Sequence, residues 1–141
     1  MTRQPVLTAA EVHEFLNEVF PQMRDVYVIE ELASMRARVR MPVRYEYLRP
    51  GGTVSGPTLF SAADCAFWIA LLGMIGREAM SVTTTMTINF LRRPPEADII
   101  AEARLLKLGR TLVTGDVLLY SDGMDEPVAN ATGSYAIPQP R

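Results

Sequence analysis

A nearly unbroken apolar stretch from residue 57 to residue 75 is the feature that most constrains the fold of this chain. The stretch predicts a helix with hydrophobic residues on almost every side, and such a helix has to be surrounded by other structure. Pro57 suits the first turn of a helix, and the glycines of the preceding turn permit unusual backbone angles. The sequence therefore predicts a central helix that the rest of the chain wraps.

Length, charge and composition exclude several other classes of protein. Asp64 interrupts the apolar stretch and leaves it shorter than the roughly 18 residues of a membrane span, and the N-terminus lacks the apolar core of a signal peptide, so a cytoplasmic protein is expected. The formal net charge of -2 gives no basic surface for nucleic acid. One cysteine and one histidine predict no metal site. A chain of 141 residues fits a single domain, residues 1–141.

Periodic patterns on both sides of the central helix predict a short helix and a sheet. Residues 8 to 11 form a capping-box pattern, and helical spacing continues to near Pro21. Strand patterns cover residues 26–32, 33–43, 82–90, 99–108, 111–120 and 126–137. Tight turns join the last three strands into an antiparallel meander. The expected fold class is α+β, with a curled antiparallel sheet of about five or six strands around one long apolar helix.

Two of these strands alternate strictly between apolar and polar residues. Arg36, Arg38 and Arg40 are expected on a solvated face, and the alternative is a phosphate-binding stripe. The strand at residues 82–90 is expected to carry two faces, one with Val82, Thr84, Met86, Ile88 and Phe90, the other with Thr83, Thr85, Thr87 and Asn89.

Asp64 is the candidate functional residue of the central helix. A buried charge is costly unless it is paired, so this carboxylate is either held by a partner or used in function. The free amides at the start of the helix and an acid two turns later are expected to face one small volume. Two interpretations remain open: a structural pairing with Arg49 or with hydroxyls such as that of Ser61, and a carboxylate that reacts with a substrate or contacts it.

Several short motifs follow one another in a fixed order. They are the glycine turn before the helix, then Phe60-Ser61-Ala62-Ala63-Asp64, Ile88-Asn89-Phe90-Leu91-Arg92-Arg93-Pro94, Leu108-Gly109-Arg110 and Ala131-Thr132-Gly133-Ser134-Tyr135. In this order they resemble the hot-dog-fold acyl-CoA thioesterases, in the branch of phenylacetate-pathway and 4-hydroxybenzoyl-CoA thioesterases. The resemblance covers about residues 45 to 137 and implies a hot-dog fold.

The resemblance also implies a role for particular residues. Asp64 matches the catalytic acid of the family, and Gly56 matches the glycine whose amide polarises the thioester carbonyl. Arg49 stands where the family has Asn or Gln, and Ser55 stands where it has His. Ser55 is expected to be a turn or helix-cap hydroxyl rather than a nucleophile, because no base is expected beside it.

The remaining implied sites concern the substrate. Trp68 lies one turn beyond Asp64 and either packs in the core or closes the acyl pocket. Arg92 and Arg93 either bind the phosphates of CoA or form a solvated strand end. The implied activity is hydrolysis of an acyl-CoA without a cofactor, by a homodimer or a dimer of dimers with the site between subunits. The alternative is a non-hydrolytic protein that binds acyl-CoA or fatty acid, in which Arg49 holds a carboxylate or phosphate.

Overall fold

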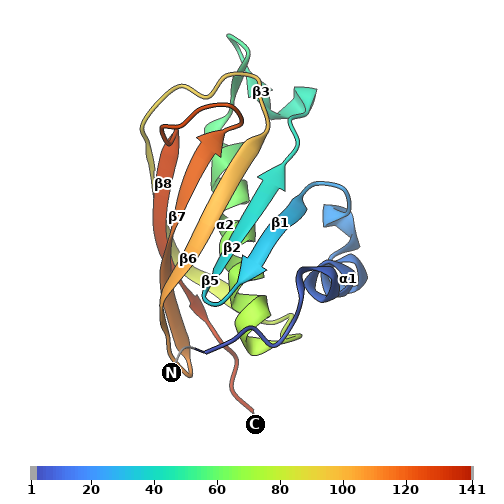
Figure 1. The fold of residues 1–141 in the computed structure, drawn as a ribbon. Helices are drawn as coiled ribbons and strands as arrows, with labels where there is room; N and C mark the ends of the chain where they lie inside the picture. Colours follow the sequence, from blue (N-terminus) through green and yellow to red (C-terminus); the bar gives the residue numbers. More distant parts are fainter. Residues whose placement is uncertain (1–2, 141) are drawn as a thin grey trace.

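The structure is a computed structural model, and it describes residues 3–140. A six-stranded antiparallel sheet curls around one long helix, α2 (Gly56–Ile75), as Figure 1 shows. The strand order is β1-β2-β6-β7-β8-β5, so β6, β7 and β8 form the predicted meander. The strands are β1 (Val28–Ala33), β2 (Arg36–Met41), β5 (Val82–Phe90), β6 (Ile99–Leu108), β7 (Leu112–Ser121) and β8 (Ala129–Ala136). The predicted fold class and hot-dog arrangement are confirmed.

Shorter elements frame the two ends of this arrangement. Helix α1 (Ala9–Val19) begins at the predicted capping box, in which Thr8 and Glu11 each accept a hydrogen bond from the other's backbone amide. It is followed by a 3-10 turn, η1 (Pro21–Met23), and both lie beside β1 (Figure 1). A second 3-10 turn, η2 (Tyr45–Tyr47), leads into a hairpin of β3 (Leu48–Arg49) and β4 (Thr53–Val54), which delivers the chain to the start of α2.

Helix α2 is buried on most sides but keeps one exposed stripe. Its core-facing side chains include Phe67, which reaches so close to β7 that a Cβ on Gly115 would lie 2.9 Å from the ring. The less buried positions recur every three or four residues, which places them on one side of the helix. We call them the open stripe: Pro57, Phe60, Ser61, Asp64, Cys65 and Trp68.

The predicted exclusion of a membrane span needs a correction. Helix α2 has 20 residues and a mean hydropathy of 1.7, so length and composition alone would allow it to cross a membrane. The apolar stretch is therefore long enough, in spite of Asp64. Its surroundings differ from those of a span, because 67% of its most apolar window is buried inside the protein. The helix serves as the core of the fold.

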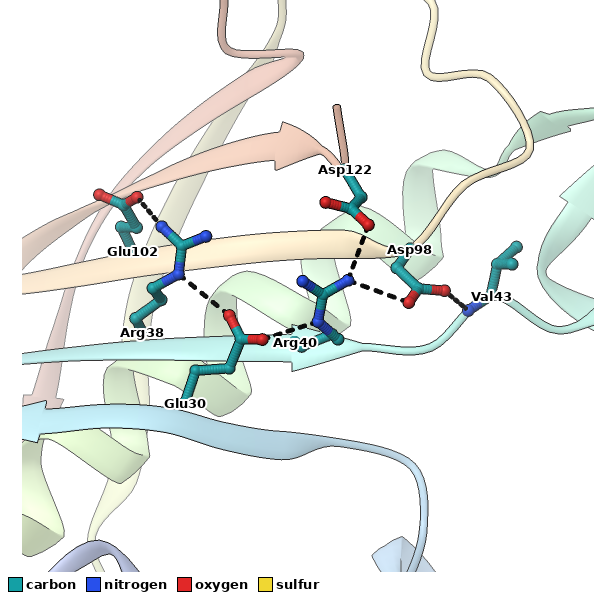
Figure 2. A network of polar contacts seen from close by, with 7 residues as sticks. All are labelled: Glu30, Arg38, Arg40, Val43, Asp98, Glu102 and Asp122. Atoms are coloured by element: carbon teal, nitrogen blue, oxygen red, sulfur yellow. Dashed lines mark hydrogen bonds and ion pairs between the residues drawn. The ribbon is translucent and has the colours of Figure 1, made fainter. Parts of the chain in front are cut away.

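The arginines of β2 lie on the outer face of the sheet, and carboxylates pair with them there (Figure 2). Arg40 contacts Glu30 at 2.7 Å, Asp98 at 3.1 Å and Asp122 at 3.0 Å, while Arg38 joins Glu30 to Glu102. The hydrogen bond from Arg40 holds the pKa of Glu30 below its ordinary value. A face on which carboxylates pair with the arginines does not favour phosphate, so the alternative of a phosphate-binding stripe loses its support.

Strand β5 departs from the predicted alternation. Thr83 pairs with Tyr135 and Thr85 pairs with Ser134, so Thr84 is an extra residue that forms a bulge. Directly paired residues share a face of the sheet, and Tyr135 is buried against the helix. The bulge therefore places Thr83 on the face of the sheet toward the helix, whereas Thr85 lies on the opposite face. Unbroken alternation had predicted both residues on the same face.

Candidate active site

Two hydroxyl groups hold the Asp64 carboxylate. Thr83 Oγ1 donates to Asp64 Oδ1 at 2.7 Å, and the Tyr135 hydroxyl donates to the same oxygen at 2.6 Å. The Tyr135 hydroxyl also lies 3.1 Å from the backbone carbonyl oxygen of Asp64. Within residues 3–140 no hydrogen bond to Oδ2 is formed. One carboxylate oxygen is thus fixed in place, and the other is available for a substrate or a water molecule.

Tyr135 is positioned by the core of the protein. Its ring stacks on Phe67 with centroids 4.9 Å apart and planes 10° apart, and 4% of the residue is exposed. Burial, together with the charge of Asp64, raises the pKa of the Tyr135 phenol. The phenol therefore keeps its proton at neutral pH and remains a hydrogen-bond donor to the carboxylate.

Hydroxyl groups hold Asp64, as one structural interpretation expected, but they belong to Thr83 and Tyr135 instead of Ser61, and Arg49 is not a partner. Arg49 is exposed in β3, and the part of the chain that the structure describes contains no ion pair between it and Asp64. The expectation that Gly56 and Asp64 face one volume is also wrong for a single chain. Eight residues along a helix correspond to about 12 Å, too far for both groups to contact one carbonyl. They line two different hollows instead.

The first hollow, which we call the Asp64 pocket, has a volume of about 150 Å³. Apolar and aromatic side chains dominate its wall, which consists of Leu16, Phe20, Met23, Tyr27, Ser61, Asp64, Cys65, Trp68 and Tyr135. The rings of Trp68 and Phe20 lie 6.0 Å apart. Burial and the charge of Asp64 raise the pKa of the Cys65 thiol to about 12, so this thiol is protonated and unreactive at neutral pH.

The second hollow, the Gly56 hollow, is open and has a volume of about 630 Å³. Arg49, Arg92 and Arg93 all line it. Arg92 is held by Glu126 at 2.8 Å and by the backbone carbonyl of Pro127 at 2.7 Å. Arg49 and Arg93 form no ion pair with any residue in the described range. The three predicted arginines therefore line the same hollow. Arg92 is paired with a carboxylate, and within residues 3–140 Arg49 and Arg93 are not.

Ser55 has the structural role that the sequence favoured. It is the N-cap of α2, and its hydroxyl accepts a hydrogen bond from the Thr58 amide at 3.3 Å. The same hydroxyl lies 2.8 Å from Thr58 Oγ1. Because both contacts are to Thr58, no base activates Ser55 within residues 3–140. In the same part of the chain, no group of three or more His, Cys, Asp and Glu side chains is placed to hold a metal ion.

Comparison with known proteins identifies the family of this chain. A family model described as "Thioesterase superfamily" matches residues 51–128, which include Gly56, Asp64 and Thr83. The chain belongs to the thioesterase superfamily. Its activity is thus that of a thioester hydrolase in general terms, and the carboxylate of α2 lies inside the matched region.

Individual relatives support the same family. A structure from Silicibacter sp. TM1040, described as a "putative thioesterase", is 44% identical, covers 99% of this chain and 97% of its own, and superposes with a TM-score of 0.91. A mutant of the phenylacetic acid degradation protein PaaI from Thermus thermophilus is 28% identical, with 84% and 99% coverage and a TM-score of 0.71. A protein from Saccharolobus solfataricus named "Putative esterase" is 30% identical, with 94% and 87% coverage.

Some residues of this candidate site were missed in the sequence. Thr83 was grouped with Thr85 on one face of the strand, and no role was inferred for Tyr135. A tyrosine on the buried face of a strand needs a partner for its hydroxyl, and this signal was available. The contributions of Phe20 and Met23 to the pocket were not predictable, because they depend on how α1 and η1 pack against α2.

Proposed function

We propose that this thioesterase hydrolyses an acyl-CoA to the free acid and CoA. Asp64 acts as general base or nucleophile, and the Gly56 amide is the oxyanion donor. The observation that supports this most strongly is the arrangement of Asp64, a carboxylate on the open stripe with one oxygen held by Thr83 and Tyr135 and the other available. The cytoplasm is the compartment that we propose for the reaction.

The chemistry requires few groups. In the general-base route, Oδ2 of Asp64 takes a proton from water, and the water oxygen attacks the carbonyl carbon of the thioester. The Gly56 N–H stabilises the negative charge that develops on the carbonyl oxygen, an effect of roughly 3–4 kcal/mol for a single donor. The C–S bond then breaks, and the CoA thiolate takes the proton from Asp64. In the nucleophilic route, Oδ2 attacks the carbonyl carbon, the C–S bond breaks, and CoA leaves as the thiolate from an anhydride of Asp64. Water then hydrolyses the anhydride to the free acid and the Asp64 carboxylate, and the thiolate takes the proton that water releases.

The distance between Gly56 and Asp64 favours a site made by two chains. A two-fold axis that passes near Phe60 would exchange the two positions, because Phe60 lies midway between them in α2. Strand β5 gives the same centre. Phe90 covers Gly56, and Thr83 binds Asp64, so the midpoint of the strand lies between Met86 and Thr87. Antiparallel pairing of β5 with its own copy at this point would bring Gly56 of one chain toward the partner's carboxylate.

The surface around β5 suits such pairing. This strand is at one edge of the sheet, and an unpaired edge is a template for another strand. Apolar side chains are exposed along it and beside it: Phe60 (37% exposed), Val82 (55%), Phe90 (56%) and Leu91 (50%). We therefore propose a homodimer, or a dimer of such dimers.

The arginines of the Gly56 hollow are candidates to bind the phosphates of CoA. We propose Arg49 and Arg93 for this role, because Arg92 is already bound to Glu126 and Pro127. The arginine at position 49, where the resemblance predicts Asn or Gln, would then bind substrate rather than orient water. Guanidinium groups match phosphate oxygens well in geometry and charge.

The test measures thiol release from a panel of acyl-CoAs by the wild-type protein, Asp64→Asn and the control Asp125→Asn. Asn keeps the shape of the side chain but cannot take a proton, so turnover by Asp64→Asn should fall about 10²–10⁴-fold with the melting temperature preserved. Asp125 is exposed and lies outside both hollows, so Asp125→Asn should match the wild type. Wild-type hydrolysis retained by Asp64→Asn would refute the catalytic role. Tight acyl-CoA binding without any release by the wild type would favour a non-hydrolytic binding protein.

A further inference from the structure

We infer that the acyl group of the substrate is compact and apolar, no larger than one ring or a chain of about six carbons, and that Trp68 together with the α1–η1 segment sets this limit. The inference rests on the proposed thioester hydrolysis and adds the substrate class. Its structural basis is the Asp64 pocket: the position of the pocket indicates which part of the substrate it holds, its volume indicates the size of that part, and its wall indicates which residues set the limit.

The position of the pocket assigns it to the acyl group. The thioester carbonyl has to lie within contact distance of Asp64 Oδ2, and both groups attached to that carbonyl need space. The Asp64 pocket begins at this carboxylate and is lined mainly by apolar side chains. The Gly56 hollow is open and holds the charges of Arg49 and Arg93. An apolar chain fits the first space, and the phosphates of CoA fit the second.

The volume of the pocket sets the size. Drug-sized ligands occupy pockets of about 300–1,000 Å³, whereas an apolar cavity of about 150 Å³ holds a molecule the size of benzene. The Asp64 pocket has a volume of about 150 Å³. A long fatty acyl chain therefore exceeds it unless the wall moves.

The wall that limits the pocket is a feature of this chain outside the region of the family match. Leu16, Phe20 and Met23 come from α1, its C-cap and η1, before residue 51, where the match with the family model begins. Next to Phe20 in the wall, Trp68 places the largest side chain of the sequence one turn from Asp64, and the two ring centroids lie 6.0 Å apart. Chain length is thus limited by these aromatic residues rather than by the catalytic carboxylate.

The single tryptophan allows a binding test that does not depend on turnover. The Asp64→Asn protein is used because it should bind an acyl-CoA without hydrolysing it. Titration of this variant with hexanoyl-CoA should change the fluorescence emission of Trp68 until the change saturates. CoA alone should leave this emission unchanged, and dodecanoyl-CoA should cause a smaller change or require about tenfold more ligand. An emission that responds equally to CoA and to every acyl chain would overturn the assignment of the pocket.

Variants of the wall test the size limit in the active protein. For the wild type, kcat/KM in a series from acetyl-CoA to hexadecanoyl-CoA should peak at or below hexanoyl-CoA. Trp68→Ala and Met23→Ala should each raise the ratio of dodecanoyl-CoA to hexanoyl-CoA activity about tenfold, because they enlarge the pocket. Met23→Trp should lower activity with hexanoyl-CoA and spare acetyl-CoA. The matched control is Met124→Ala, a partly buried methionine outside the pocket, which should leave the chain-length profile unchanged.

The outcomes separate this inference from the proposed function. Saturable emission changes with hexanoyl-CoA but no hydrolysis of any thioester would keep the pocket and reject the hydrolase. Hydrolysis with a profile that peaks at long chains, or that stays the same in both Met23 variants, would keep the hydrolase and reject the size limit. Met23 lies at the partly exposed edge of the pocket, so its variants test the limit even if Trp68→Ala fails to fold.

Discussion

The two oxygens of the Asp64 carboxylate have different environments, and this difference explains how an acid on a core helix is tolerated. An ionised carboxylate only accepts hydrogen bonds, and Thr83 and Tyr135 supply two of them to Oδ1. Within residues 3–140, these two donors stabilise the charge and no cation pairs with it. Because Oδ1 is fixed, the direction in which Oδ2 points is fixed as well.

Tyr135→Phe tests this positioning role. Removal of one of the two hydroxyl donors should leave Asp64 in place but less well oriented, so kcat should fall about tenfold while KM stays within a factor of two. The ring still stacks on Phe67, so the loss of stability should be limited to about 1.5–3 kcal/mol, the range for a hydrogen bond to a charged group. Steady-state kinetics and thermal unfolding measure the two effects.

The control for Tyr135→Phe is Tyr120→Phe, which removes a hydroxyl from the outer face of the sheet and should change neither constant. A rise in KM with unchanged kcat would show instead that Tyr135 contacts the substrate directly. Unchanged values of both constants would leave Thr83 as the only residue that positions Asp64.

At the scale of elements, the sequence was informative wherever local pattern decides the structure. The all-round apolar character of residues 57–75 predicted that α2 lies inside the sheet, and the alternation in β6 and β7 predicted the meander. The bulge at Thr84 was not predictable, because alternation continues through it and no glycine marks it. Its position depends on the pairing of β5 with β8, two strands that are distant in sequence.

The candidate site was predicted only in part, because local sequence pattern identifies Asp64 but not the residues that reach it from distant strands. Asp64 was identified because a carboxylate in an apolar helix requires an explanation. Arg49 was considered as its partner, but Arg49 lies in β3, before the start of α2, and the helix rise of 1.5 Å per residue places Asp64 about 12 Å beyond that start. Thr83 became a partner only through the bulge. Residues that meet across the fold cannot be paired from one sequence when several polar candidates are available.

The end of strand β5 provides a prediction about neighbouring arginines. Arg93→Ala should raise KM for acyl-CoA several-fold, weaken its salt dependence and leave kcat nearly unchanged, because a phosphate contact contributes to ground-state binding. Arg92→Ala should have little effect on KM and should lower the melting temperature, since it breaks the contacts with Glu126 and Pro127. Steady-state kinetics with acyl-CoA, and with a short thioester that lacks the nucleotide, distinguish the two variants.

The short thioester is the decisive comparison for this pair. A phosphate contact predicts that Arg93→Ala hydrolyses it as the wild type does. Equal losses with both substrates would show that Arg93 supports the strand instead, and the phosphate assignment would be withdrawn.

At the scale of the whole molecule, the proposed division of the site between two chains predicts complementation. Gly56→Pro removes the amide hydrogen at the first position of α2, where the backbone tolerates proline and the Phe90 ring, 3.2 Å from the added Cβ, has to shift slightly. Asp64→Asn removes the base, so each variant alone should be nearly inactive. In a mixed dimer one site combines the intact Gly56 with the intact Asp64. Random reassembly of equal amounts should therefore restore about a quarter of wild-type activity. The measurement is thiol release after joint refolding.

Two observations would contradict the shared site. One is a mixture no more active than its components, although sedimentation shows that dimers have formed. The other is a wild-type protein that sediments as a monomer near 15.7 kDa at micromolar concentration and still hydrolyses acyl-CoA.

The ion-pair network on the outer face of the sheet also makes the charge distribution of the molecule asymmetric. Four guanidinium groups there face six carboxylates: Arg36, Arg38, Arg40 and Arg104 against Glu30, Glu31, Asp98, Glu102, Asp116 and Asp122. Arg49 and Arg93 lie at the Gly56 hollow without such compensation in the described range. A polyanion such as CoA is therefore repelled from the back of the sheet and attracted toward the start of α2, which orients it before contact, and added salt weakens both effects.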